Sequence, residues 1–319
     1  MRIRTVNSSV KTPANLPYVT SFAEVGSLEV RLAESPREIR AAQALRYRVF
    51  YDEMRADPSP EMAAEKRDFD AFDEKCDHLL VVDRTRVGDD RVVGTYRLLR
   101  ESVAGGINGF YSSQEYDLHP LFSDSFRHTM MQDKQLLELG RSCVHKDYRT
   151  NSTIHLLWRG IAYYTLLHNV GYMFGCASLP GTDPKAHAEV LSYLYHEFRV
   201  SDRFPVRAQS DRFVEMNMIP AGELDIRQAR RLLPPLVKGY LRLGCFIGDG
   251  AVIDWQWGST DVFILLPVER ITARYQQHFD LVSEAADSVR FDDAADSPAA
   301  NNEQAGIGQS ASHNATRKI

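Results

Sequence analysis

The stretch LLELGRSCVHKDYR, residues 136–149, places a carboxylate and a guanidinium inside an apolar run. Its opening part has the apolar character of a buried β-strand, and this strand carries Glu138 and Arg141. A charged group in a protein core costs several kcal/mol unless it is paired or used. The chain must therefore fold so that these two residues form a structural ion pair or the floor of an active site.

The chain as a whole has the composition of a soluble globular protein, and its 319 residues are enough for one large domain or two smaller ones. No stretch approaches the roughly 20 apolar residues that a transmembrane helix needs. The basic N-terminus lacks the apolar segment of a secretory signal. Because Cys76, Cys143, Cys176 and Cys245 form no CxxC pair, we expect a reduced cytoplasmic protein with no metal site.

The formal net charge of −5 is spread unevenly along the chain. Residues 280–319 hold seven acids and three bases, so they carry −4 and residues 1–279 carry only −1. The near-neutral remainder argues against general nucleic-acid binding. The polar, small-residue-rich composition after residue 280 predicts a disordered acidic tail.

Hydrophobic periodicity predicts the order strand, helix, three strands, helix, strand and helix. The predicted strands are residues 28–34, 77–83, 92–100, the start of the opening stretch, and 172–180. The predicted helices are residues 37–54, 152–171 and 183–198, the second ended by Gly171. Residues 55–76 are expected to form a charged loop. This order predicts an α/β (α+β) fold, a central mixed sheet with an antiparallel meander flanked by helices.

Four segments are expected along the chain. Residues 1–27 form a flexible leader, residues 28–202 the core, residues 203–279 a C-terminal extension packed on the core, and residues 280–319 the tail. The extension contains a basic amphipathic stretch with two prolines, a strand pair around Gly258 and a short helix near its end.

Seven segments occur in an order that resembles the bacterial ornithine N-acyltransferases of aminolipid synthesis, which are also called hemolysin-like. They are LRYRVFYDEM, FDEKCDHLLVVD, VVGTYRLLR, LELGRSCVHKDYR, PPLVKGYLRLG, DGAVIDWQW and TDVFILLPVERI. The resemblance covers residues 28–278 and extends, more distantly, to the acyl-homoserine-lactone synthases. It implies the GNAT acyltransferase fold. It also implies transfer of a long-chain 3-hydroxyacyl group from acyl carrier protein to the α-amine of ornithine, forming lyso-ornithine lipid.

The sequence departs from ordinary GNAT proteins in the segment that follows the strand of the opening stretch. In those proteins a glycine-rich loop brings backbone N–H groups onto the pyrophosphate of coenzyme A. Here the segment is RTNSTI, which contains no glycine. The phosphopantetheine of a carrier protein has a single phosphodiester, which Arg149, Asn151 and Ser152 are expected to hold. No cofactor is therefore expected, because the carrier protein brings its own phosphopantetheine.

Amide formation at a thioester needs a proton acceptor for the amine and a polarised carbonyl. Given the resemblance, Glu138 is the expected base, with a pKa raised by burial. Arg141 is expected to orient Glu138 or to bind a substrate carboxylate. An ion pair between the two residues is the structural alternative.

The resemblance also implies an acceptor site. The segment RDFDAFDEKCDH is dense in acids, and Asp70 and Asp73 are expected to bind the cationic amines of the acceptor. An exposed acidic loop is the alternative. Arg46 is expected to contact the acceptor carboxylate or to order this loop, with a surface position as the alternative. Arg97 is expected to pair with Glu138 or with an acid of the loop.

The basic stretch after residue 224 has three interpretations. Its cations are Arg227, Arg230, Arg231, Lys238 and Arg242. They fit the acidic helices of a carrier protein, an anionic lipid surface or plain solvent. The expected location is the cytoplasm, with a peripheral contact to the inner face of the cytoplasmic membrane as the second interpretation.

Four aromatic residues are expected to line an acyl tunnel or, equally, to pack in the core: Phe110, Tyr111, Trp255 and Trp257. His78 and His145 are expected to be structural rather than proton carriers.

Other functions stay open at this point. One is an enzyme like the acyl-homoserine-lactone synthases, although these are shorter than this chain. Another is acylation of glycine or glutamine, and a third is a carrier-protein-binding module without catalysis. A membrane-lysing protein has no support, because the sequence lacks a signal, a transmembrane stretch and pore-forming alternation.

Overall fold

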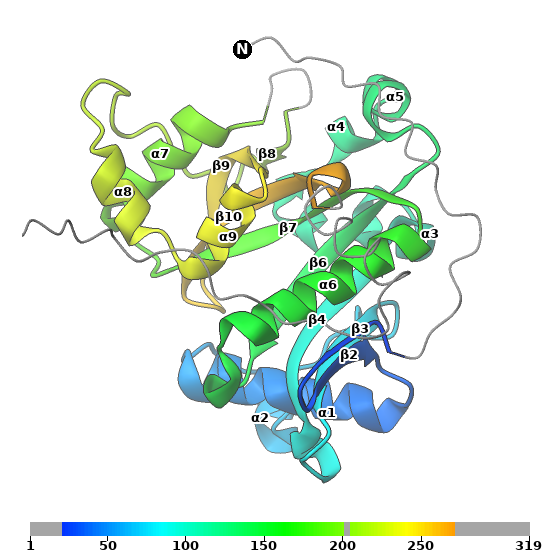
Figure 1. Ribbon diagram of the computed structural model, residues 1–319. Coiled ribbons are helices and arrows are strands. Elements are labelled where there is room, and N and C mark those ends of the chain that lie inside the picture. Colours follow the sequence, from blue (N-terminus) through cyan, green and yellow to red (C-terminus); the bar gives the residue numbers. More distant parts are fainter. Residues whose placement is uncertain (1–20, 201–204, 272–319) are drawn as a thin grey trace, which may run out of the picture. The chain divides into compact units, whose positions relative to one another are not determined.

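The computed structural model describes residues 21–200 and 205–271. Within these residues, ten strands form a mixed sheet in the order β1-β2-β3-β4-β6-β7-β10-β9-β8-β5 (Figure 1). The strands are β1 Ala23–Val25, β2 Leu28–Leu32, β3 Asp77–Asp83, β4 Val92–Arg100, β5 Tyr116–Asp117, β6 Gln135–Val144, β7 Val170–Pro180, β8 Arg207–Ala208, β9 Phe246–Asp254 and β10 Ser259–Pro267. Neighbouring strands are antiparallel except for β6–β7 and β8–β9, which are parallel.

The described helices flank this sheet. They are α1 Pro36–Tyr47, α2 Pro60–Glu65, α3 Glu101–Ala104, α4 His119–Phe122, α5 Asp124–Phe126, α6 Asn151–Leu167, α7 Ala188–Phe198, α8 Ile226–Leu232 and α9 Pro235–Arg242. The predicted class, with its antiparallel meander β2-β3-β4-β6, is confirmed. In this part of the chain every helix is too short or too polar to cross a bilayer.

Strand β3 shows why both faces of the sheet are covered. Its alternate residues Leu79 and Val81 pack in the core cluster that contains the apolar face of α6. Leu80 and Val82 pack in the cluster that contains α1. Successive side chains of a strand point to opposite faces, so an uninterrupted apolar run places one helix on each side.

Helix α1 begins where the sequence predicted it. The Ser35 hydroxyl accepts the N–H of Glu38, and Pro36 occupies the first turn. The helix then continues as a π-helix over Arg48–Glu53. The following segment, predicted to be a loop, contains the short helix α2.

Two predicted boundaries are wrong. Strand β1 lies inside the expected leader, where it pairs with β2. Helix α6 ends at Leu167 and not at Gly171, because Asn169 adopts the left-handed conformation (φ 50°) that the glycine was expected to supply. Gly171 lies instead within β7.

The expected extension adds to the sheet. The β9–β10 hairpin turns at Gly258 as predicted, with φ +60°. Strand β10 then pairs with β7 along all of Ser259–Pro267. The expected acidic tail and most of the expected leader lie outside the described residues. The short helix predicted near the end of the extension begins at Val268, and its continuation beyond Ile271 also lies outside them.

Gly160 tests how tightly α6 packs on the sheet. A Cβ atom there would lie 2.7 Å from Val30 Cγ2 and 3.2 Å from Leu79 Cδ1. Gly160→Ala is therefore expected to lower the free energy of unfolding by about 1–3 kcal/mol, measured by urea denaturation. Gly239→Ala in α9 is the control, because its Cβ would meet nothing within 4 Å. It is expected to stabilise by about 0.5–1 kcal/mol, and equal losses in both variants would contradict the packing argument.

Candidate active site

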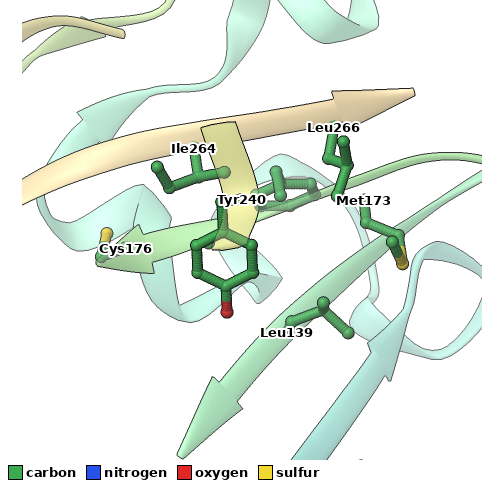
Figure 2. Close-up of a pocket in the computed structure, with 8 residues that line it drawn as sticks. Leu139, Met173, Cys176, Tyr240, Ile264 and Leu266 are labelled. Atoms are coloured by element: carbon green, nitrogen blue, oxygen red, sulfur yellow. The ribbon is translucent and has the colours of Figure 1, made fainter. Parts of the chain in front are cut away.

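The parallel β6–β7 ladder ends inside the sheet and opens a pocket beside it. The last paired residues are Glu138 and Phe174, although both strands continue for several residues. A small apolar pocket, partly open to solvent, lies at this point (Figure 2). It is lined by Leu139, Met173, Phe174, Gly175, Cys176, Tyr240, Ile264 and Leu266.

Glu138 is buried at the end of this ladder. Its carboxylate accepts the backbone N–H groups of Tyr111 (2.8 Å) and Ser112 (2.7 Å) and the hydroxyl of Ser112 (2.5 Å). Burial raises the pKa of Glu138, and the hydrogen bonds from Ser112 and Tyr111 offset this only in part. The carboxylate therefore anchors the segment that starts at Tyr111.

Arg141 lies on the same face of β6 as Glu138 because of a β-bulge. Strand β4 pairs Arg97 with Gly140 and Thr95 with Cys143, so β6 carries one extra residue between them. Arg141 has φ +51°, a conformation that costs a non-glycine residue about 1–2 kcal/mol. Without the extra residue, Arg141 would point to the face covered by α6.

The Arg141 guanidinium lies between two aromatic rings. Its central carbon is 4.9 Å from the ring centroid of Tyr111 and 4.6 Å from that of Trp257. It also donates to Asp68 (3.3 Å) and Asp70 (3.2 Å). Burial disfavours its charge, but these neighbours more than compensate, so the pKa of Arg141 is raised. The alternative of a Glu138–Arg141 ion pair is wrong, because the arginine is directed to the acids of the loop.

A network of six charged residues holds that loop. It consists of Arg46 from α1, Arg97 from β4, Arg141 from β6, and Asp68, Asp70 and Asp73 from the loop after α2. Arg46 is 1% exposed and donates to Asp68 (2.7 Å) and Asp73 (2.8 Å). Burial opposes the ionised form of Asp73, but Arg46 outweighs it and lowers the pKa of Asp73 to about 2.

This network decides between the alternatives left by the sequence. Arg46 orders the loop and is not a surface residue. Arg97 pairs with Asp70 (2.6 Å), an acid of the loop, and not with Glu138. The exposed-loop alternative is wrong because Asp73 is buried, with its carboxylate held by Arg46 and the backbone N–H of Asp70. Asp70 remains partly open to solvent.

A second group of acids was not predicted from the sequence. Oxygen atoms of Glu115, Asp254 and Asp261 all lie within 4.8 Å of one another. Burial and Asp261 raise the pKa of Glu115 to about 7, and burial raises that of Asp261 to about 6. Asp261 follows Ser259 and Thr260 at the polar start of β10, so the sequence gives no signal like the one that singled out Glu138. We refer to these three residues as the acid cluster.

Two residues connect the acid cluster to the rest of the site. The Cys176 thiol of the pocket wall contacts the Glu115 carboxylate at 3.4 Å and the Ser112 hydroxyl at 3.7 Å. The backbone N–H of Trp257 donates to Asp254 at 3.0 Å, while its ring stacks on Arg141. Pocket, acid cluster and arginine therefore adjoin one another.

The residues expected to hold the donor phosphate lie at the start of α6. Thr150 caps this helix by accepting the N–H of Thr153, and Asn151 and Ser152 are exposed in its first turn. Arg149 is also exposed, where it donates to the Val144 carbonyl (3.1 Å) and pairs with Glu53.

Part of the predicted acyl tunnel is wrong. Phe110 is fully buried in the core, and Trp255 is 75% exposed. Tyr111 and Trp257 flank Arg141 rather than the apolar pocket. The histidines have structural contacts, since His78 bonds the Asp73 carbonyl and His145 accepts the N–H of Asp147.

Comparison with known proteins shows which family the chain belongs to. Residues 45–159 match the acetyltransferase (GNAT) domain family. The chain is 44% identical over 291 residues to an L-ornithine N(alpha)-acyltransferase of Rhizobium meliloti, covering 91% of this chain and 95% of that protein. The enzyme of the same name from Brucella abortus is 49% identical over 260 residues, covering 81% and 90%. The chain belongs to the L-ornithine N(alpha)-acyltransferase family.

This family member is an acyltransferase with the GNAT fold, as the sequence resemblance implied. A solved structure of an N-acyl amino acid synthase from uncultured soil microbes aligns with a TM-score of 0.39 at 13% identity, covering 77% of this chain and 93% of that one.

The buried network predicts that replacing two arginines of α1 will destabilise the protein to very different extents. Arg46→Ala leaves Asp68 and Asp73 without their main partner, so the free energy of unfolding should fall by about 3–5 kcal/mol. Arg37→Ala is the control, because Arg37 and Asp89 form an exposed pair and its loss should cost less than about 1 kcal/mol. Urea denaturation measures both, and a loss for Arg46→Ala as small as that of the control would refute the structural role.

Proposed function

We propose that the protein transfers a long-chain acyl group from acyl carrier protein to the α-amine of ornithine and releases lyso-ornithine lipid. One arrangement carries the proposal: an apolar pocket, an arginine between two rings and the acid cluster adjoin one another at the end of the β6–β7 ladder. The names of the relatives support ornithine as the acceptor.

The donor would enter where β6 and β7 part. Beyond Glu138, the edge of β6 that faces β7 is no longer used by the ladder, so its backbone groups are available to the amides of a phosphopantetheine arm. The first carbons of the acyl chain, next to the thioester, would enter the apolar pocket. Asn151 and Ser152, at the positive end of α6, would hold the phosphodiester, with Arg149 turning to it from Glu53.

Each charged group of the acceptor would lie against a residue of opposite charge. Ornithine carries one carboxylate and two ammonium groups before the reaction. Arg141 would take the carboxylate, because a guanidinium held between two rings is preorganised for it. The acid cluster would take the side-chain ammonium. Asp70, partly open beside Arg141, would face the α-amine, while Arg46, Arg97 and Asp73 position this end of the site.

The chemical step forms one bond and breaks one. The free α-amine attacks the thioester carbonyl, the C–N bond forms, and the C–S bond breaks to release the pantetheine thiolate. The α-ammonium first releases one proton to solvent to give this free amine. The amine then loses a second proton as the amide forms, which we assign to Glu138 through the Ser112 hydroxyl, and the thiolate takes one proton on leaving. The pKa of Glu138, raised by burial, suits a proton acceptor.

A product assay tests the proposal. Purified protein would be incubated with 3-hydroxyacyl carrier protein or with the same acyl group on coenzyme A. The acceptors would be ornithine, lysine, glutamine, glycine and S-adenosylmethionine, with products identified by mass spectrometry. We expect N-acyl-ornithine from the carrier-protein donor. Formation of a lactone from S-adenosylmethionine would overturn the proposal, and so would acyl transfer from acyl-coenzyme A but not from the acyl carrier protein.

The acid cluster predicts a change in acceptor preference. Glu115→Gln should raise KM for ornithine about 10- to 100-fold, since a hydrogen bond to a charged group contributes about 1.5–3 kcal/mol. KM for glutamine, whose side chain is neutral, should change little. Glu74→Gln, an exposed acid of the loop, is the control. Equal changes for ornithine and glutamine would contradict the assignment.

The pKa of Glu115 gives the same assignment a pH dependence. Its carboxyl is neutral below pH about 7 and cannot then pair with an ammonium. The ratio of kcat/KM for ornithine over glutamine should therefore rise as the pH rises through about 7. The groups that face Glu115 are Asp261, Asp254, Cys176 and Arg212. Because the pKa of Asp261 is about 6, a smaller rise in the same ratio near pH 6 should remain in the Glu115→Gln variant.

A further inference from the structure

Helices α8 and α9 combine basic and apolar side chains on one exposed surface. Residues 226–242 contain five arginines and lysines and no acid. Nine large apolar residues of the described chain are exposed, and three of them lie within the eleven residues from 226 to 236. We define the α8–α9 surface as Ile226, Arg227, Arg230, Arg231, Leu232 and Leu236.

The exposure of these apolar residues is not explained by packing within the chain. Ile226, Leu232 and Leu236 are 42%, 55% and 40% exposed. The two helices already bury a separate set of side chains, Ala229, Leu233, Val237 and Tyr240, in the core. Ile226 and Leu232 border the buried face of α8 at Ala229, and Leu236 lies one turn before Tyr240 on α9. Exposed apolar side chains that extend a buried face, next to several arginines, are typical of an interaction surface.

The charges of the surface fit a phosphate-bearing partner. Asp225, Arg227, Arg230 and Arg231 line a shallow recess at the start of α8. Three guanidinium groups around one recess suit the phosphodiester of a lipid headgroup. Apolar side chains beside such cations are typical of helices that lie at a membrane interface.

Helix α9 also contributes a residue to the apolar pocket. Tyr240 projects from α9 among the residues of the pocket wall (Figure 2). Its hydroxyl lies 3.3 Å from that of Tyr96, and its ring packs edge-on against Trp158 of α6. Leu236 and Tyr240 are four residues apart and therefore lie on the same side of α9. The α8–α9 surface thus adjoins the apolar pocket along this helix, and both helices can be followed in Figure 1.

We propose that the α8–α9 surface docks on an anionic membrane, with Leu232 and Leu236 in the headgroup boundary and the arginines on lipid phosphates. The apolar pocket would then lie beside the bilayer, one turn along α9 from Leu236. The link to product release rests on the proposed function, since an acylated amino acid is an amphiphile that partitions into lipid. Membrane docking itself does not depend on that activity.

Vesicle binding of the full chain tests the proposal. Co-sedimentation would compare vesicles of phosphatidylcholine alone with vesicles that also contain phosphatidylglycerol. We expect binding at least about tenfold stronger to the anionic vesicles, weakened by added salt. Equal binding to both vesicle types, or binding to neither, would overturn the proposal.

Two pairs of variants locate the contact. Leu232→Ser with Leu236→Ser removes the apolar part, and Arg230→Glu with Arg231→Glu reverses the charge. Each should weaken binding to anionic vesicles about tenfold or more. Val87→Ser and Arg37→Glu, exposed residues distant in sequence, are the matched controls and should bind as the unchanged protein does. Variants that bind like the controls would overturn the proposal, and thermal unfolding verifies that each variant is folded.

Assays of acyl transfer by the same variants distinguish a surface that binds the membrane from one that binds the carrier protein. Activity in solution without vesicles should be unchanged in both pairs. If Arg230→Glu with Arg231→Glu raises KM for acyl carrier protein and leaves vesicle binding intact, the surface binds the carrier protein and the proposal is overturned. Vesicle binding without any acyl transfer would contradict the proposed function but not the docking surface.

Discussion

Arg46 leaves the buried face of α1 and meets Asp68 and Asp73 of the loop that follows α2. All three side chains are withdrawn from solvent, so their charges are stable only in each other's presence. The loop has little apolar content of its own, and this pairing fixes its course against the sheet. Removal of the arginine would leave two buried carboxylates unpaired, and the loop would lose its position. The geometry around Arg141 depends on this pairing.

The orientation of the Arg141 side chain is fixed by its own strand, by the acids of the loop and by Tyr111. The bulge in β6 turns its side chain to the α1 face, and Asp68 and Asp70 then hold it. Tyr111 is in turn held by Glu138 through its backbone N–H, so its ring lies over the guanidinium. Backbone strain at Arg141 is thus offset by charge pairing and ring contacts. Strain of this kind is found where a side chain must be presented in a defined direction.

Much of this fold could be predicted from periodicity, because the strands are continuous apolar runs and the helices begin at recognisable caps. Strand β3 and helix α1 follow directly from their residues. The burial of Glu138 was also predicted, since a carboxylate in an apolar strand must be used or paired. Its partners were not, because the bulge changes the side-chain parity of β6 and no local pattern in the sequence marks it.

The acid cluster shows a second limit of prediction from one sequence. Glu115 lies far along the chain from Asp254 and Asp261, and only the strand order brings the three together. Asp261 stands at the polar start of β10, next to Ser259 and Thr260, so its strand gave no signal of the kind that marked Glu138 in β6. The roles of the other charged residues depended on which neighbours the fold supplied. Arg97, for example, had two candidate partners in sequence and has one of them in the structure.

The most direct measurement is a crystal structure of the protein with Nα-acyl-ornithine bound. We expect the ornithine carboxylate within hydrogen-bond distance of the Arg141 guanidinium. The side-chain ammonium should lie against Glu115 and Asp261, and the first carbons of the acyl chain in the pocket beside Leu139 and Tyr240. A carboxylate bound away from Arg141, or an acyl chain that does not enter this pocket, would contradict the proposed binding mode.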